Sequence, residues 1–260
     1  MHLSAVVQNL KRHQFLFSEL VKRDFKLKYK GTMLGMFWSI LSPLLQLLVM
    51  RLVFTEFFGR NTPFYTSYLF SGLIVFNFYS ESTKGAMGAL LSNKSIISKI
   101  NVPGSLFILS RNVSSLINFG CILLVYNVFI AIDGIHFSLR LLALLYPILL
   151  LPLFNLGIGM ILSTLQVFFR DTKYLYDIFI ILLRYMSAIF YNIDKFSLDK
   201  QRYFLINPVY AFIKYFRIVV IQGDIPSLQY HLLLLFYTAA ALLLGALIYR
   251  KNRNNFLYYM

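Results

Sequence analysis

Charged residues are scarce in this chain of 260 residues, since they make up 13% of it against 58% hydrophobic residues. A water-soluble domain of this length could not present enough polar surface with that composition. Acidic residues are scarcer still, because 10 Asp and Glu stand against 25 Lys and Arg. The composition excludes an ordinary soluble protein and indicates that a membrane is the solvent of this chain.

Cysteine and histidine are also too sparse to build a reactive centre. The single cysteine, Cys121, cannot form an intrachain disulfide, and the four histidines lack the spacing of metal ligands. No Gly-x-x-x-x-Gly-Lys-[Ser/Thr] loop occurs, and no catalytic triad or carboxylate pair can be argued from the sequence. We therefore expect a chain that is not an enzyme, binds no metal or cofactor itself and does not hydrolyse ATP by the P-loop route.

Long apolar stretches fill most of the sequence, and six of them approach the roughly 20 residues that a membrane-crossing helix needs. They predict an all-helical membrane protein in which residues 1–35 precede a six-span domain of residues 36–260. The predicted spans are Met36–Phe58, Tyr65–Ser82, Leu106–Ile132, Leu141–Phe169, Tyr174–Tyr191 and Leu228–Tyr249.

The basic residues predict the orientation of these spans. With six spans and a cytoplasmic N-terminus, fifteen Lys and Arg lie in inside segments. Each short outside loop holds one, and the longer segment 192–227 holds five. This asymmetry favours both termini in the cytoplasm. It also explains the net charge of +15 through contact with anionic lipids, and no nucleic-acid-binding motif accompanies it.

The first thirty residues have the pattern of an amphipathic helix rather than of a cleaved signal peptide. Apolar residues such as Leu10, Phe17 and Leu20 recur at helical spacing, and Lys11 and Lys22 lie on the other side. The pattern favours an interfacial helix on the inner leaflet. The alternative is a basic leader folded against the first span.

The inside segment between the second and third spans predicts a short amphipathic helix. Ile96, Ile97 and Ile100 would share one face, and Pro103 with Gly104 would end the helix. Such a helix can insert its apolar side chains into a groove of a partner protein or rest on lipid headgroups. The pattern alone leaves these two interpretations open.

The outside segment 192–227 also contains a predicted helix. Asn207 can cap a helix that Pro208 begins, and the apolar run 209–221 that follows is too short to cross a membrane. A re-entrant or interfacial helix is expected, which would act as a gate or simply cap the bundle.

Charged residues inside the predicted spans should face the bundle interior or water. They are Arg51, Glu56, Arg111, Asp177 and Arg184. We expect structural pairing, with Arg111 bound to Asp177 and Glu56 bound to an arginine. The alternative is that Arg51 or Arg184 contacts a phosphate or an acidic sugar.

Three short motifs, in this order, resemble those of bacterial ABC-type polysaccharide export permeases. The first is the entry to span one, residues 29–44, which reads YKGTMLGMFWSILSPL. The second is Phe168-Phe169-Arg170-Asp171-Thr172, and the third is Asn207-Pro208 with an aromatic residue, Tyr210, two positions later. Together with six spans, the motifs cover essentially the whole chain. Members of this family export O-antigen, capsule and teichoic acid chains.

The resemblance implies one half of a transporter in the bacterial cytoplasmic membrane. Two copies of this chain would pair with two copies of a separate subunit that binds ATP and Mg, and would move a lipid-linked glycan. It implies a coupling helix at about 91–103, a cytoplasmic loop motif, and two short exit-side gate helices within 192–227. The residues that would couple to the partner are Lys94, Ile96, Ile97, Lys99, Ile100 and Pro103. The loop motif is Phe169, Arg170 and Asp171, and the gate residues are Asn207, Pro208 and Tyr210.

Aromatic residues make up 17% of the chain and suggest how a glycan could pass. Sugar rings present apolar C–H faces that pack on aromatic planes, so spans one and five are the expected lining of a conduit. The expected lining residues are Phe37, Arg51, Phe54, Phe57, Tyr176, Phe179, Arg184, Tyr185 and Tyr191. The alternative is that these residues are the ordinary aromatics of membrane interfaces and lipid-facing surfaces.

Two other functional classes stay open at this point. A membrane-embedded lipid-carrier transferase would need a cluster of Asp, His or Lys at one membrane face, and only Arg170-Asp171 approaches that. An ATP-independent glycolipid flippase would not need a cytoplasmic helix for a motor.

Overall fold

The computed structural model describes residues 13–54, 64–100, 102–193 and 196–260. Helices account for 82% of the described residues, which contain no strand. The predicted all-helical class is therefore confirmed.

The helices run in the following order. They are α2 (Gln14–Tyr29), η1 (Gly35–Phe37), α3 (Trp38–Phe54), α4 (Tyr65–Ser92), α5 (Lys94–Ile97), α6 (Ser105–Ile132), η3 (Leu139–Leu144), α7 (Leu145–Phe168), α8 (Thr172–Met186), α9 (Leu198–Phe204), α10 (Pro208–Arg217), the π-helix η4 (Ile218–Gln222), α11 (Leu228–Asn252), η5 (Arg253–Asn255) and α12 (Phe256–Tyr259).

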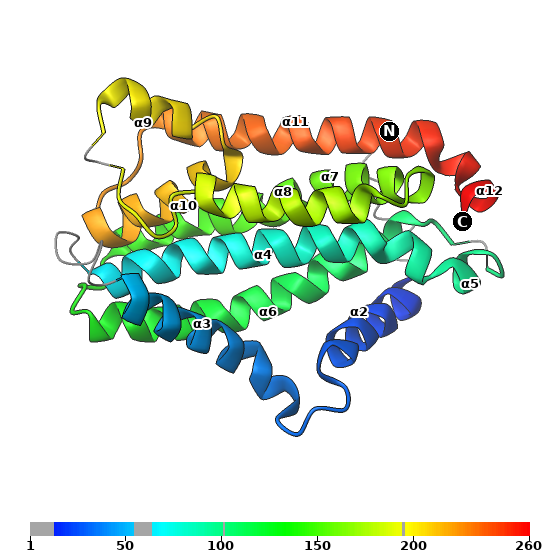
Figure 1. The fold of residues 1–260 in the computed structure, drawn as a ribbon, viewed down its shortest axis with the longest axis horizontal. Coiled ribbons are helices and arrows are strands. Elements are labelled where there is room, and N and C mark those ends of the chain that lie inside the picture. The colour runs from blue at the N-terminus through cyan, green and yellow to red at the C-terminus, as the bar shows by residue number, and fades with distance from the viewer. Residues whose placement is uncertain (1–12, 55–63, 101, 194–195) are drawn as a thin grey trace.

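Helix α4 lies at the centre of the bundle (Figure 1). Most of its side chains are buried, and it packs against α6 and α7, while α11 packs on α7. The bundle has two distinct ends. We call the end that holds α5, residues 169–171 and α12 the α12 end, and the end that holds α9, α10 and η4 the α10 end.

Helices α7 and α11 cross with their backbones in direct contact. A Cβ atom added to Gly157 would overlap the backbone of Ala241, and one added to Gly245 would overlap the backbone of Gly157. Small residues allow this approach in membrane bundles, where close packing replaces the hydrophobic effect as the source of association. The crossing joins the last long helix to the bundle.

Four described helices are long and apolar enough to cross a membrane. They are Gly35–Phe54, Ser105–Ile132, Leu139–Phe168 and Leu228–Tyr259. They overlap the first, third, fourth and sixth predicted spans. The fifth predicted stretch forms α8, which has 15 residues and ends at Met186 rather than at Tyr191.

Helix α4 is longer than the second predicted span. Helix α4 begins at Tyr65, as expected, but continues ten residues beyond Ser82 to Ser92. The charged residues where the apolar pattern stops have partners. Glu81, just before this extension, is bound to Lys28, and Lys84, within it, is bound to Asp177. Because these charges are paired, the helix can continue where the apolar pattern stops.

The described part of the N-terminal segment forms α2, which packs on α6. Leu20 is buried in that contact, whereas Phe15 and Leu27 are exposed. Residues 1–12 of the predicted amphipathic helix lie outside the described residues. The bundle therefore covers part of the apolar face that was expected to rest on lipid or on the first span.

A buried carboxylate joins α2 to α6. Asp24 lies 2.8 Å from Arg23 and 3.3 Å from Arg111, and the Ser110 hydroxyl donates to it. The predicted pairing of Arg111 with Asp177 is therefore wrong, because Asp177 pairs with Lys84 at 2.6 Å. Glu56, the other acidic residue of that prediction, lies outside the described residues.

Candidate functional site

The predicted conduit residues of the first span lie on an open side of the molecule. Phe37 in η1 is exposed, and so is Arg51 in the last turn of α3. The Phe54 ring stacks on Phe190 with centroids 5.1 Å apart. Phe57 lies outside the described residues. Helix α3 buries only Ser39 and Leu47, so most of its apolar surface faces outward.

Helix α8 divides the predicted conduit residues between its two sides. Tyr176 is buried and donates a hydrogen bond of 2.7 Å to the Thr83 hydroxyl, so it packs inside the protomer. Phe179 and Tyr185 are exposed, by 46% and 61%. The outer side of α8 is therefore the only part of this helix that could line a path outside the protomer.

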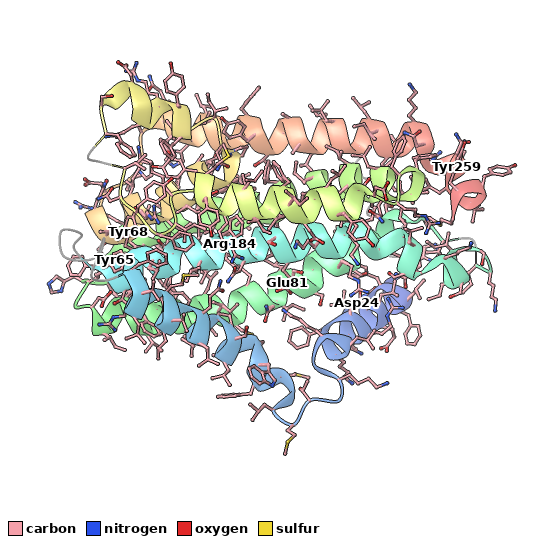
Figure 2. The ribbon with its side chains drawn as sticks, viewed as in Figure 1. Asp24, Tyr65, Tyr68, Glu81, Arg184 and Tyr259 are labelled. Atoms are coloured by element: carbon pink, nitrogen blue, oxygen red, sulfur yellow. The ribbon has the colours of Figure 1, made fainter. Side chains whose placement is uncertain are left out.

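Two arginines lie towards the α10 end of these helices. Arg184 is in the last turn of α8, and its guanidinium lies 5.1 Å from the centre of the Phe76 ring (Figure 2). Arg51 occupies the last turn of α3. Charges of this kind are tolerated in a membrane when they face water, a protein interior or a polar ligand. Helices α3 and α8 thus each combine an exposed apolar surface with an arginine in the last turn.

The predicted gate begins with the expected cap. The Asn207 side chain accepts hydrogen bonds from the backbone N–H groups of Val209 and Tyr210, and Pro208 is the first residue of α10. Asn207 also donates a bond of 2.9 Å to the Ser187 hydroxyl. Tyr210 is buried and packs on Phe204 of α9. The predicted N-cap is confirmed, and it connects α10 to the segment that follows α8.

Arg217 makes several buried contacts at this end, and the sequence did not single it out. It is 7% exposed, and its guanidinium lies 3.5 Å from the centre of the Tyr68 ring. It donates to the backbone carbonyls of Ala188 and Ile189 at 2.9 and 3.0 Å. A cation in an otherwise apolar run was the available signal. We call the contacts of Arg217 with Tyr68, Ala188 and Ile189 the Arg217 clamp.

Two tyrosines of α4 hold the same segment from the other side. The Tyr65 hydroxyl donates to the carbonyl of Phe190 at 2.9 Å, and the Tyr68 hydroxyl donates to that of Tyr191 at 2.7 Å. Figure 2 shows Tyr65 and Tyr68 together at the α10 end. Four consecutive carbonyls, from residues 188 to 191, thus have side-chain donors from α4 and α10. The segment that follows α8 is therefore bonded to both helices.

The predicted coupling segment is a helical turn rather than one continuous helix. Helix α4 ends at Ser92, α5 covers only Lys94–Ile97, and Pro103 precedes α6. Ile96 and Ile97 are half-buried against the bundle, whereas Lys99 and Ile100 are exposed. The expected apolar face is therefore divided. Ile100 is its most accessible member.

The loop motif and the chain terminus lie beside this segment. The Lys94 ammonium binds the backbone carbonyl of Met260, and Arg170 donates to that of Tyr259 at 3.3 Å. Phe169 is exposed, and Asp171 precedes α8 as its N-cap residue. Tyr259 marks this end in Figure 2. The C-terminal residues thus connect two segments that sequence reasoning had treated separately.

The site offers no evident place for a metal ion. Within the residues that the structure describes, no group of three or more His, Cys, Asp or Glu side chains could hold one. The described residues instead present two helices with exposed apolar sides, a segment after α8 bonded by buried side chains, and exposed segments at the α12 end.

Such a bundle, with apolar helices long enough to cross a membrane, defines an all-helical membrane protein. Residues 16–221 match the family model described as ABC-2 type transporter, and the chain belongs to this family. Similar proteins include the O-antigen export system permease protein RfbA of Klebsiella pneumoniae, which is 28% identical over 93% of this chain and 95% of its own length. RfbA of Myxococcus xanthus is 24% identical over 96% of this chain and 97% of its own length. The polysialic acid transport protein KpsM of Escherichia coli is 24% identical over 90% of this chain and 92% of its own length.

Proposed function

We propose that this chain is the membrane subunit of an ATP-driven exporter that moves a lipid-linked polysaccharide across the bacterial cytoplasmic membrane. The observation that carries the proposal is the match, over at least nine-tenths of the chain, to permeases named for O-antigen export and polysialic acid transport. Full-length similarity supports a shared transport role better than any single motif does.

In this proposal two copies of the chain form the path. The exposed sides of α3 and α8 support such pairing, because each combines apolar surface with an arginine near the α10 end. Water or a polar glycan between the copies would stabilise Arg51 and Arg184 better than lipid could. Aromatic residues of α8, including Phe179 and Tyr185, would offer planes along which sugar rings can slide.

The proposed topology has six spans, formed by α3, α4, α6, α7, α8 and α11, with both chain ends in the cytoplasm. Helices α9 and α10 would re-enter the membrane from the outside and close the path. After Cys121 is replaced, the His136→Cys variant should react with an impermeant thiol reagent from outside. The Lys94→Cys and Asn255→Cys variants should react only from inside, and the reverse pattern would contradict this topology.

ATP hydrolysis would be coupled to transport at the α12 end. Two copies of an ATP-binding subunit, carrying ATP and Mg, would dock on the segment 91–103 and on the loop with Arg170. Ile100 would insert into the partner, because it is the apolar residue of this segment that is most exposed. Burying an isoleucine side chain contributes roughly 2 kcal/mol.

A double variant tests this docking. Ile97→Asp with Ile100→Asp should abolish ATP-dependent export while the permease still accumulates in the membrane. Ser98→Asp is the matched control, because Ser98 is exposed in the same segment but contributes no apolar surface. If the double variant exported glycan at the wild-type level, the proposal that this segment couples the two subunits would be wrong.

Co-purification is the direct test of the proposed class. An ATP-binding subunit should be retained with this chain in equal amounts when it is purified from its own cells, and a glycolipid identified by mass spectrometry should accompany the complex. A lipid-carrier transferase would instead convert the glycolipid without an ATP-binding partner. An ATP-independent flippase would move it without ATP, and either result would overturn the proposal.

A further inference from the structure

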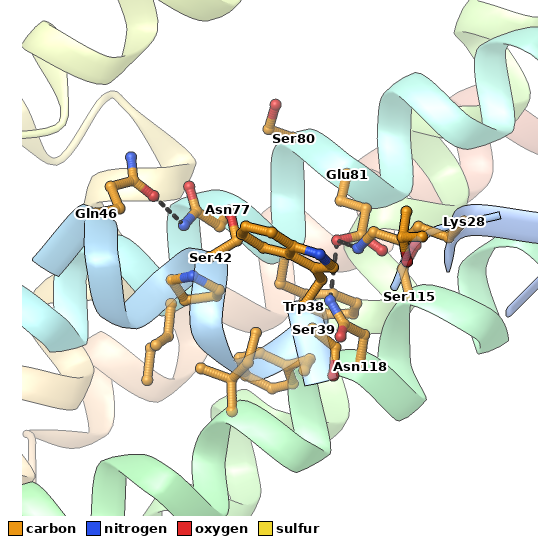
Figure 3. Close-up of a pocket in the computed structure, with 16 residues that line it drawn as sticks. Lys28, Trp38, Ser39, Ser42, Gln46, Asn77, Ser80, Glu81, Ser115 and Asn118 are labelled. Atoms are coloured by element: carbon orange, nitrogen blue, oxygen red, sulfur yellow. Dashed lines mark hydrogen bonds and ion pairs between the residues drawn. The ribbon is translucent and has the colours of Figure 1, made fainter. Parts of the chain in front are cut away.

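A polar cavity of about 500 Å³ lies between α3, α4 and α6, near the end of α2 (Figure 3). This is within the size range of small-molecule sites. Its deeper walls are apolar and buried, and include Phe78, Phe119 and Ile122. The cavity is on the inner side of α3 and is separate from the exposed surface of that helix.

The polar groups of the cavity are already ordered by one another. Glu81 accepts hydrogen bonds from Lys28 at 2.7 Å and from Asn118 at 3.1 Å. The Asn77 amide donates to Gln46 at 2.9 Å. Serine hydroxyls from three helices add further donors and acceptors. These serines are Ser39, Ser42, Ser80 and Ser115.

The charge of the cavity argues against a phosphate or another anion as its ligand. Its single cation, Lys28, is bound to Glu81, so the pair is close to neutral. What remains is a set of amides and hydroxyls that both donate and accept hydrogen bonds. Trp38 lines the same space, and this residue is 37% exposed. A neutral ligand with many hydroxyl groups and an apolar face fits this set.

We propose that this cavity binds a neutral pyranose unit of the exported glycan. The amides of Asn77, Gln46 and Asn118 would hydrogen-bond the sugar hydroxyls, and Trp38 would pack on the C–H face of the ring. This inference rests on the proposed function, and it adds a sugar subsite apart from the surfaces of α3 and α8.

The sequence offers a direct reporter, because Trp38 is the only tryptophan of the chain. The purified full-length chain in lipid nanodiscs is titrated with tetrasaccharides of mannose, galactose and N-acetylglucosamine while Trp38 emission is recorded. At least one should shift the emission saturably, and inorganic phosphate should neither shift it nor compete. The responding tetrasaccharide is then presented on a lipid anchor. Saturation by either form supports the site, and tighter saturation by the anchored form identifies a lipid-linked source.

Asn77→Ala should weaken that binding by about tenfold, since it removes a donor and disorders Gln46. Asn127→Ala is the matched control, because Asn127 is exposed on α6 and bonds only within its own helix. The proposal is overturned if no tetrasaccharide moves the emission, if phosphate competes, or if the control weakens binding equally. Because glycan export by the complete transporter is measured separately, loss of this subsite alone would leave the proposed function standing.

Discussion

The two ends of the bundle are held by different kinds of contact. At the α10 end, the buried Arg217, Tyr65 and Tyr68 bind consecutive backbone carbonyls after α8. At the α12 end, the side-chain hydrogen bonds from Lys94 and Arg170 to the C-terminal residues come from exposed side chains. Buried hydrogen bonds resist local opening, whereas exposed contacts exchange readily with water.

This difference matches what an exporter asks of its two ends. An outward end that stays closed at rest prevents leakage of ions, which needs buried and well-satisfied contacts. An end that docks a motor needs surfaces that can leave one partner and bind another. If the comparison is right, equivalent substitutions at the two ends should have very different effects on stability.

The largest effect is expected at the Arg217 clamp. Arg217→Met keeps much of the side-chain volume but leaves the carbonyls of Ala188 and Ile189 without these donors. It should lower the free energy of unfolding by about 3 kcal/mol, measured by thermal denaturation in nanodiscs. Arg140→Met is the control, because Arg140 binds Gly223 at the same end but is exposed. Equal effects of the two variants would contradict the comparison.

Asp24 separates the influence of burial from that of position. It lies on α2, away from the α10 end, yet it is buried and bound to Arg23, Arg111 and Ser110. Asp24→Asn should cost about 2 kcal/mol because it leaves Arg111 without its carboxylate. Protease sensitivity of α2 should rise as well. Asp199→Asn is the control and should leave the free energy of unfolding unchanged, because Asp199 is exposed. If Asp24→Asn also left it unchanged, burial would not govern these contacts.

A smaller effect is expected at the cap of α10. Asn207→Ala removes the bonds to the backbone N–H groups of Val209 and Tyr210 and should cost about 1 kcal/mol. Ion leakage through the assembled exporter at rest should increase. Asn252→Ala serves as control, since Asn252 bonds a carbonyl of its own helix. Unchanged leakage with lowered stability would limit Asn207 to a structural role.

The smallest effect on stability is expected at the α12 end. Lys94→Ala with Arg170→Ala should change the free energy of unfolding by less than about 0.5 kcal/mol. The same double variant should nevertheless lower the ATP hydrolysis that export stimulates, because both side chains hold segments that would meet the ATP-binding subunit. A large loss of stability with normal coupling would reverse our assignment of the two ends.

Local patterns in the sequence predicted the structure best. The cap of α10 was predictable because Asn207 binds N–H groups two and three residues later, and the sequence displays that spacing directly. The start of α4 at Tyr65 was predictable from the onset of its apolar run.

Contacts between distant residues were not predictable in this way. Helix α4 continues past Ser82 because its charged residues there meet distant partners: Glu81 binds Lys28, which is 53 positions away, and Lys84 binds Asp177. Arg111 pairs with Asp24 rather than Asp177, since the packing of α2 on α6 decides which carboxylate lies near. Charge and hydropathy show that such residues need partners, but only the packed bundle identifies them.

The sequence contains only a weak indication of the Arg217 clamp, again because the partners of Arg217 are distant in the sequence. An arginine at the end of an apolar helix is equally compatible with an exposed position or a buried one. The folded chain buries Arg217 because the carbonyls after α8, including that of Ala188, require donors there. The sequence contains no pattern that predicts the C-terminal contacts of Lys94 and Arg170. Their acceptors are backbone carbonyls, which every residue type carries.

Transport by the reconstituted complex tests the central claim most directly. The chain and its ATP-binding partner are placed in proteoliposomes with a fluorescent lipid-linked glycan, and its movement across the bilayer is followed. We predict movement that requires ATP and Mg, that stops in the Ile97→Asp, Ile100→Asp variant, and that continues in Ser98→Asp. Movement without ATP, or no movement although the complex is intact, would contradict the account.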